Sequence, residues 1–314
     1  MINIRRGDCR DVLKTLDEKS INTCITSPPY YGLRDYQEDK QIGLELTPDK
    51  YVQQIVEVFR EVRRVLRDDG TVWLNLGDTY CGTGHKGDTK DPKHKEGRNG
   101  QREAVNNKLI GFKAKDLIGI PWRVALALQS DGWYLRQDII WHKPNPMPES
   151  VKDRCTKSHE YIFLLSKQPN YYYDYEAIKE KAKGERWGGN KPINMNNTKD
   201  IDNQFNGLTR ERKMLFDERN KRSVWTVNPK PYKEAHFAVF PTELIEPCVL
   251  AGCPEGGTVL DPFGGSGTTG LVADRHKRNA VLIELNNDYI DIAEDRLKGD
   301  APLFSNIIIA SEAE

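Results

Sequence analysis

Residues 259–275 have the sequence VLDPFGGSGTTGLVADR, in which a short apolar run leads into a glycine-rich turn and then into apolar residues at helical spacing. Such a pattern is typical of a β-strand, a tight turn and an α-helix in succession. An apolar run at 280–284 and a helical pattern at 289–297 follow. The sequence therefore predicts parallel strands joined by helices near the carboxyl end of the chain.

The rest of the chain continues this alternation of strands and helices. Apolar runs at 2–4, 21–26 and 71–76 predict strands, and helical spacing predicts helices at 9–16 and 51–66. Further helices are predicted at 121–129 and 242–251, and further strands at 133–141 and 161–165. We therefore predict an α/β fold with a doubly wound, mostly parallel sheet, in which the last two strands form an antiparallel hairpin at one edge.

Two polar stretches interrupt the alternation. Residues 81–115 are rich in Gly, Lys, Asn and Asp without apolar periodicity, which predicts a long mobile loop. Residues 175–233 are equally polar but contain scattered aromatic side chains, which is typical of an inserted region that orders on a partner. The predicted organisation is a catalytic domain formed by 1–174 and 236–300, an insertion at 175–235, and a carboxyl-terminal tail at 301–314.

The charge is zero overall but unevenly distributed. Residues 84–115 hold nine Lys or Arg against four Asp or Glu, and residues 178–235 hold fourteen against eight. Two basic segments on an acidic body favour contact with a phosphate backbone, although solvated loops would give the same pattern. The six cysteines are scattered without metal-ligand spacing, so we expect no metal site. The absence of an apolar leader or a spanning segment predicts a cytoplasmic protein that does not enter a membrane.

The glycine turn is a candidate cofactor site. Gly265, Gly267 and Gly270 match the dinucleotide-binding spacing, and Glu284 ends the next strand, where a carboxylate can accept ribose hydroxyls. Both NAD and S-adenosylmethionine carry such a ribose. Asp261 favours the second, because a carboxylate beside the turn repels a pyrophosphate but accepts a hydrogen bond from an ammonium group.

A second candidate site follows the predicted strand at 21–26. There Ser27, Pro28, Pro29 and Tyr30 combine a stiff backbone with a hydroxyl, a carbonyl and a flat ring. An exocyclic amine on a base is a poor nucleophile until acceptors hold its hydrogens. Ser27 and the Pro28 carbonyl supply two acceptors, while Tyr30 supplies a stacking face.

These two motifs, SPPY and DPFGGSG, in this order and about 230 residues apart, resemble the permuted, beta class of amino-methylating DNA methyltransferases. The resemblance covers most of the chain outside the polar stretches. It implies that S-adenosylmethionine is the cofactor, double-stranded DNA the substrate, and 175–235 the target-recognition region. The residues it implies around the cofactor are Asp8, Phe240, Pro241, Asp261, Phe263, Gly265, Gly267 and Glu284, and those near an extruded base are Lys143, Pro144 and Asn145.

The resemblance leaves the methylated base open. Serine at the first motif position, as in Ser27, accompanies N4-cytosine methylation in this family, whereas aspartate or asparagine accompanies N6-adenine methylation. We therefore predict N4 of cytosine, with N6 of adenine as the alternative. The resemblance also makes a cognate restriction endonuclease and a homodimer further expectations for the partners of this protein.

Other functions fit the sequence less well. A nicotinamide-dependent oxidoreductase explains the glycine turn and Glu284 but leaves SPPY and the segregated charge unexplained. Carbon-5 methylation needs a cysteine nucleophile, and Cys248 lies among apolar residues of a predicted helix, which indicates a buried core thiol. His142 and His159 receive no catalytic assignment.

Overall fold

The structure is a computed structural model of the chain. It describes residues 1–82 except 34, 37 and 39, residues 112–182 except 147, and residues 218–229, 240–300 and 307–310. The chain forms two compact units, one made of Met1–Tyr173 with Ser223–Glu314 and the other of Asp174–Arg222. Residues 83–111 of the predicted loop at 81–115, and residues 183–217 and 230–233 of the polar stretch at 175–233, lie outside the described residues.

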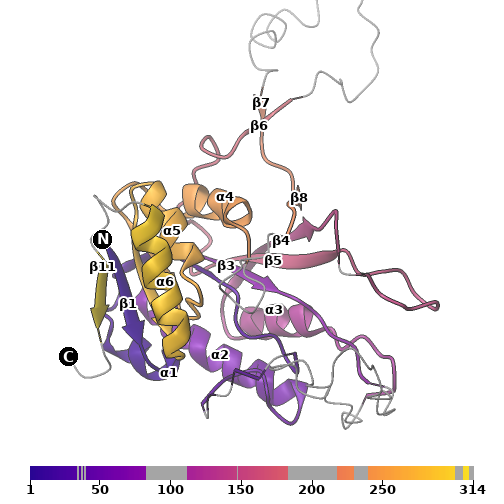
Figure 1. Cartoon of the computed structure of the whole chain (residues 1–314). Helices are drawn as coiled ribbons and strands as arrows, with labels where there is room; N and C mark the ends of the chain where they lie inside the picture. The colour runs from indigo at the N-terminus through magenta and orange to yellow at the C-terminus, as the bar shows by residue number, and fades with distance from the viewer. Residues whose placement is uncertain are drawn as a thin grey trace, which may run out of the picture. The chain divides into compact units, whose positions relative to one another are not determined.

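The larger unit is built on a nine-stranded sheet with the order β11-β1-β10-β9-β2-β3-β5-β4-β8 (Figure 1). All neighbouring strands run parallel except β5, which is antiparallel to both β3 and β4. The strands are β1 Ile2–Arg6, β2 Ile21–Thr26, β3 Leu66–Leu76, β4 Tyr134–His142, β5 His159–Ser166, β8 Val224–Thr226, β9 Thr258–Asp261, β10 Asn279–Glu284 and β11 Ile307–Ala310.

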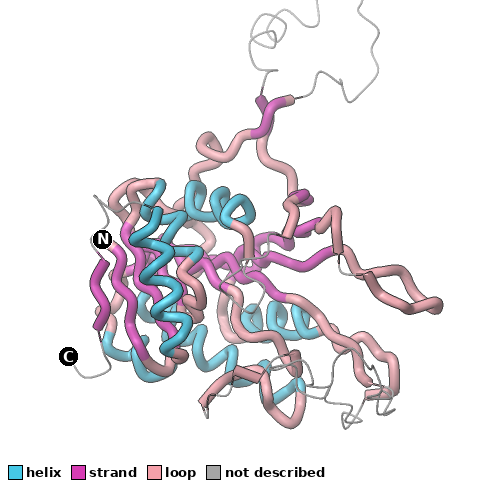
Figure 2. The backbone as a smooth tube through the Cα atoms, viewed as in Figure 1, coloured by secondary structure: helices cyan, strands magenta, loops and turns pink. Residues whose placement is uncertain are grey.

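Helices cover both faces of this sheet (Figure 2). They are α1 Cys9–Val12, followed by the short 3₁₀ helix Leu13–Thr15, α2 Pro48–Val65, α3 Ile120–Ser130, α4 Thr242–Gly252, α5 Thr268–Arg275 and α6 Asn287–Asp300. Helix α2 begins where the Thr47 hydroxyl accepts from the Lys50 amide, which satisfies a first-turn donor. None of the described helices has the length and apolar character that crossing a membrane requires.

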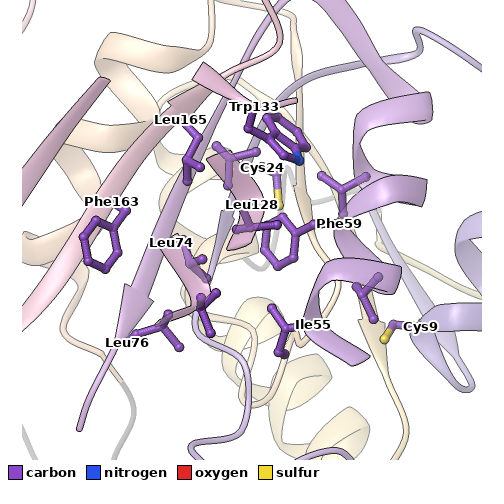
Figure 3. Close-up of a cluster of buried hydrophobic side chains, with 14 of the residues drawn as sticks. Cys9, Cys24, Ile55, Phe59, Leu74, Leu76, Leu128, Trp133, Phe163 and Leu165 are labelled. Atoms are coloured by element: carbon purple, nitrogen blue, oxygen red, sulfur yellow. The ribbon is translucent and has the colours of Figure 1, made fainter. Parts of the chain in front are cut away.

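The main core lies between the sheet and α1, α2 and α3. Alternate residues of the strands point into it, among them Cys24 of β2 and Leu74 of β3, and they pack against Ile55 and Phe59 of α2 (Figure 3). The opposite face of β2 and β3 packs against α4 so closely that a Cβ on Gly252 would lie 2.7 Å from the Trp73 indole nitrogen. Both faces of the sheet are therefore buried, as in other doubly wound folds.

The structure confirms the predicted α/β fold and the antiparallel pair, and it adds two strands. The predicted hairpin is not at the edge, because β8 pairs with β4 on its outer side. Its central Trp225 is buried, which places part of the predicted insertion 175–235 in the larger unit. Within the predicted tail 301–314, β11 pairs with β1 and forms the other edge of the sheet.

The smaller unit, Asp174–Arg222, contains a two-stranded antiparallel ladder of β6 Glu180–Lys181 and β7 Glu218–Arg219. Arg219 and Arg222 both pair with the Glu180 carboxylate, at 2.7 Å and 2.6 Å. These contacts tie together two segments that are far apart in the sequence. Two parts of the predicted recognition region are therefore paired with each other through β6 and β7.

Candidate active site

A cavity of about 380 Å³ lies where the carboxyl ends of several parallel strands meet. Residues that follow β1, β2, β9 and β10 line it, together with Asn75 of β3, Trp141 of β4 and Glu160 of β5. The predicted site residues among its lining are Asp8, Ser27, Pro28, Pro29, Tyr30, Lys143, Phe240, Phe263, Gly265 and Glu284. The serine-proline turn and the glycine turn therefore open into the same space, although 230 residues separate them.

The glycine turn holds the Glu284 carboxylate by backbone groups. The amide of Gly265, a residue with φ of 49°, donates to one Glu284 oxygen at 2.8 Å, and the Asn286 amide donates to the other at 2.9 Å. Burial raises the pKa of Glu284 above its usual value, against the lowering effect of these amides. The carboxylate is thus fixed at the cavity wall as a hydrogen-bond acceptor.

Asp8 lies at the amino end of α1 and caps it, accepting from the Arg10 amide at 2.9 Å. The Arg10 guanidinium also donates to both carboxylate oxygens, with its Nε at 2.9 Å and 3.1 Å. Burial acts to raise the pKa of Asp8, but the hydrogen bonds and charge of Arg10 outweigh it and hold the pKa below its usual value. Asp8 is therefore an ionised acceptor at the cavity.

Tyr30 is the most constrained side chain of the serine-proline turn. Its hydroxyl donates to Glu160 at 2.7 Å and lies 3.1 Å from the Asn75 side-chain oxygen, and the Ser27 hydroxyl lies 3.4 Å from it. Burial, followed by the nearby Glu160 charge, raises the pKa of Tyr30 well above its usual value. The phenol is therefore a neutral donor, and the hydrogen bond of its hydroxyl to Glu160 fixes the position of the ring.

Helix α2 fixes the backbone of the same turn, because the Tyr51 hydroxyl donates to the Pro29 carbonyl at 2.9 Å. Tyr51 is itself fully buried. We expect Tyr51→Phe to lower the free energy of unfolding by about 1 kcal/mol, the net value of one such hydrogen bond. The rate of the methyl transfer that the two motifs predict should fall only a few-fold, since the two prolines keep the turn stiff. Chemical denaturation and single-turnover rates measure the two effects, and an unchanged stability would show that this bond contributes nothing.

Five predicted residues do not line the cavity, namely Asp261, Gly267, Pro241, Pro144 and Asn145. Asp261 is 1% exposed and accepts from the Thr26 and Thr269 hydroxyls at 2.6 Å each, and from the Phe263 amide at 3.1 Å. Its carboxylate thus joins the end of β2 to the start of α5 behind the cavity wall. Pro241 is buried, whereas Pro144 and Asn145 are exposed in the segment after β4.

Sequence reasoning missed Asn75, Trp141 and Glu160 as lining residues. Asn75 and Trp141 lie in stretches that resemble the family, yet neither received a role. A polar residue inside the apolar run of β3 was the one available signal for Asn75, which is 4% exposed. Glu160 had no sequence signal, because its position depends on the pairing of β4 with β5.

The residues of the cavity fit S-adenosylmethionine. Two carboxylates, Asp8 and Glu284, line it as hydrogen-bond acceptors, which an adenine amine and ribose hydroxyls would require, and the glycine turn lines the same cavity. Aromatic faces are present in Phe263, Phe240 and Tyr289. An open α/β sheet with such a cavity at the carboxyl ends of its strands fits the class of S-adenosylmethionine-dependent methyltransferases that the two motifs predict.

The comparisons with known proteins identify the family. The DNA methylase family matches residues 21–295, and this chain belongs to it. Type II methyltransferase M.SmaI of Serratia marcescens is 47% identical over 93% of this chain and 89% of its own. Type II methyltransferase M.Cfr9I of Citrobacter freundii is 48% identical over 94% of this chain and 87% of its own.

Solved structures agree in fold. A putative DNA modification methylase from Thermus thermophilus, complexed with S-adenosyl-L-methionine, matches with a TM-score of 0.62 and 24% identity over the whole of both chains. PvuII DNA methyltransferase, described as cytosine-N4-specific, matches with a TM-score of 0.63 and 19% identity, over 96% of this chain and 86% of that one. The predicted enzyme class, an S-adenosylmethionine-dependent DNA methyltransferase, is confirmed.

Proposed function

We propose that this enzyme transfers a methyl group to the exocyclic N4 of cytosine in double-stranded DNA. The observation that carries the proposal is the shared cavity, in which Ser27, Pro28 and Tyr30 face the same space as Gly265 and Glu284. Serine at position 27 favours cytosine over adenine as the target. The two compact motifs supply both requirements of the reaction, a held amine and a held methyl donor.

In this proposal the Ser27 hydroxyl and the Pro28 carbonyl accept the two amine hydrogens, which directs the nitrogen lone pair away from the base ring. Tyr30 stacks on the base, whose extrusion from the duplex costs a few kcal/mol. Bound S-adenosylmethionine supplies an electrophilic methyl group. Asp8, Phe240, Phe263, Gly265 and Glu284 are the residues proposed to hold it, and Asp261 is proposed to position the two turns.

The rest of the chain has proposed roles that follow the same argument. The basic segments 84–115 and 178–235 neutralise DNA phosphates, and the second contains the proposed target-recognition region. Lys143 is proposed to contact the base, while Pro144 and Asn145 lie on the exposed side of the same segment. A cognate restriction endonuclease and a homodimer stay predictions from the family resemblance.

Incubating the protein with DNA and S-adenosylmethionine labelled on its methyl group, followed by separation of the nucleosides, tests this function. We expect label in 4-methylcytosine. Label in 6-methyladenine would reject the proposed base while keeping the mechanism. Label in neither nucleoside would reject transfer to an exocyclic amine altogether.

A further inference from the structure

We propose that Glu160 is a positioning residue that sets both base-contacting side chains, with Tyr30 on one carboxylate oxygen and Lys143 on the other, and that the Lys143–Glu160 pair selects cytosine. The inference deepens the proposed function and rests on it. It assigns the choice of base to the part of the cavity wall where Glu160 and Lys143 lie beside Tyr30. It also gives a role to a residue that no motif marks.

Side chains from three separate parts of the fold contact the Glu160 carboxylate. Glu160 lies in β5 opposite Trp141 of β4, and its side chain is 15% exposed. One oxygen accepts from the Tyr30 hydroxyl at 2.7 Å and lies 3.5 Å from the Asn75 amide nitrogen. The other oxygen accepts from the Lys143 ammonium. A shift of Glu160 would therefore move Tyr30 and Lys143 together.

Lys143 is held on three sides. Its ammonium lies 4.1 Å from the centroid of the Trp141 ring and pairs with Glu160, and its backbone amide donates to the Ser158 carbonyl at 2.8 Å. A free lysine side chain has large rotational freedom, which this arrangement removes before any substrate binds. An ammonium has three donors, and the pair with Glu160 uses one. The other two donors belong to a side chain that lines the cavity, and in this proposal they reach the bound base.

The two candidate bases differ at the edge that such a cation would face. Beside its amine, cytosine presents two acceptors in succession, the ring nitrogen N3 and the carbonyl oxygen O2. Adenine presents one acceptor, N1, followed by a C–H group. With the amine fixed at Ser27 and Pro28, a cation with two free donors satisfies both cytosine acceptors but only one adenine acceptor. The pair therefore favours cytosine.

Glu160 also balances charge. Methyl transfer places positive charge on the amine nitrogen, and an unpaired ammonium close by would oppose it. The carboxylate between Tyr30 and Lys143 compensates the ammonium, so that Lys143 donates to the base without opposing the reaction. Removing the carboxylate leaves a part-buried cation without its partner, which is more costly than removing both.

Three substitutions separate these roles. Glu160→Gln keeps an acceptor for the Tyr30 hydroxyl and removes the charge that holds Lys143. Lys143→Met removes the ammonium and keeps the length of the side chain. The combined variant removes both charges. Glu61→Gln is a matched control, because Glu61 forms a similarly part-buried ion pair with Arg64 on α2, away from the cavity.

The assay compares kcat/KM on a duplex carrying the target cytosine with kcat/KM on the same duplex carrying adenine at that position. We expect Glu160→Gln and Lys143→Met each to lower the cytosine-to-adenine ratio by about 10-fold or more, as expected for a contact that reads one base edge. The two losses should not multiply in the double variant, because the two residues act as one unit. Its cytosine-to-adenine ratio should be at least as high as the lower of the two single-variant ratios. Glu61→Gln should keep the wild-type ratio.

Calorimetric binding of S-adenosylmethionine and thermal unfolding accompany the assay, and each variant should bind the cofactor within about two-fold of wild type. Unchanged selectivity in both single variants would overturn the inference, and so would losses that multiply in the double variant. A wild-type enzyme that methylates adenine in the nucleoside assay would reject the proposed function itself, before any variant is made. The two failures are therefore distinguishable.

Discussion

Adding a methyl group at position 77, in Gly77→Ala, is expected to lower the rate of methyl transfer by about 100-fold while leaving cofactor binding intact. A Cβ on Gly77 would lie 2.4 Å from Cε2 and 2.8 Å from Cδ2 of the Tyr30 ring. The ring cannot rotate away freely, because Glu160 holds its hydroxyl at 2.7 Å. A stacking face displaced by about 1 Å from its productive position costs on the order of 100-fold in rate.

Single-turnover rates on DNA, cofactor binding by calorimetry and thermal unfolding measure this effect. Gly299→Ala is the matched control, since a Cβ at this helical position of α6 would meet no atom within 4 Å. We expect it to keep the wild-type rate and to unfold at the same or a slightly higher temperature, because alanine favours a helix over glycine. A Gly77→Ala enzyme with a wild-type rate would show that the position of Tyr30 does not limit the reaction.

The sequence located the two turns that open into the cavity because both motifs are local. A turn such as 261–270 or 27–30 contains its own geometry, and the rule that parallel strands end at one edge brings the two turns together. The cavity that Ser27 and Gly265 share has this arrangement. The same local reasoning placed most strands and helices within a few residues of their observed bounds.

Contacts that depend on strand pairing could not be predicted in this way. Glu160 reaches Tyr30 because β5 runs antiparallel beside β3, so that its first residues lie next to the end of β3. Gly77 lies against the Tyr30 ring because β2 and β3 are parallel neighbours, so that the residues after β2 lie beside the end of β3. The short strands β8 and β11 were missed as well, because three or four residues carry too little periodicity to separate a strand from a loop.

Asp261 illustrates a motif residue whose surroundings differ from its sequence expectation. The sequence predicted an acceptor for the cofactor ammonium, whereas the structure shows its carboxylate bonded to Thr26 and Thr269. Because Thr26 ends β2 before the serine-proline turn and Thr269 lies in the first turn of α5 after the glycine turn, Asp261 fixes the separation of the two turns. Its position explains why a carboxylate stands there without facing the cavity.

The burial of this carboxylate makes the stability of the enzyme depend on pH. Burial raises the pKa of Asp261 to about 7, although the hydrogen bonds from Thr26, Thr269 and the Phe263 amide lower it. In the unfolded chain the pKa lies near its ordinary value of 3.8. Below that value both states are protonated and Asp261 contributes its full stability. As the pH rises towards 7, the unfolded chain loses the proton first, so the contribution is lost.

We expect Asp261→Asn to remove this dependence. The amide keeps the shape and can accept from Thr26 and the Phe263 amide, but it does not ionise. The wild-type free energy of unfolding, taken relative to that of the variant, should therefore fall by roughly 3 kcal/mol between about pH 4 and pH 7, at about 1.4 kcal/mol for each pKa unit. Urea unfolding across this range measures the free energy of unfolding of both proteins. Subtracting the value of the variant from that of wild type at each pH cancels the contribution of the other titrating groups.

Asp17→Asn is the control, because it removes one carboxylate from an exposed position. Its difference from wild type should stay nearly constant across the same range. A difference between wild type and Asp261→Asn that also stays constant would show that Asp261 is ionised at low pH in the folded protein. The three hydrogen bonds would then outweigh burial, and Asp261 would connect the two turns as a charge and not as a neutral acid.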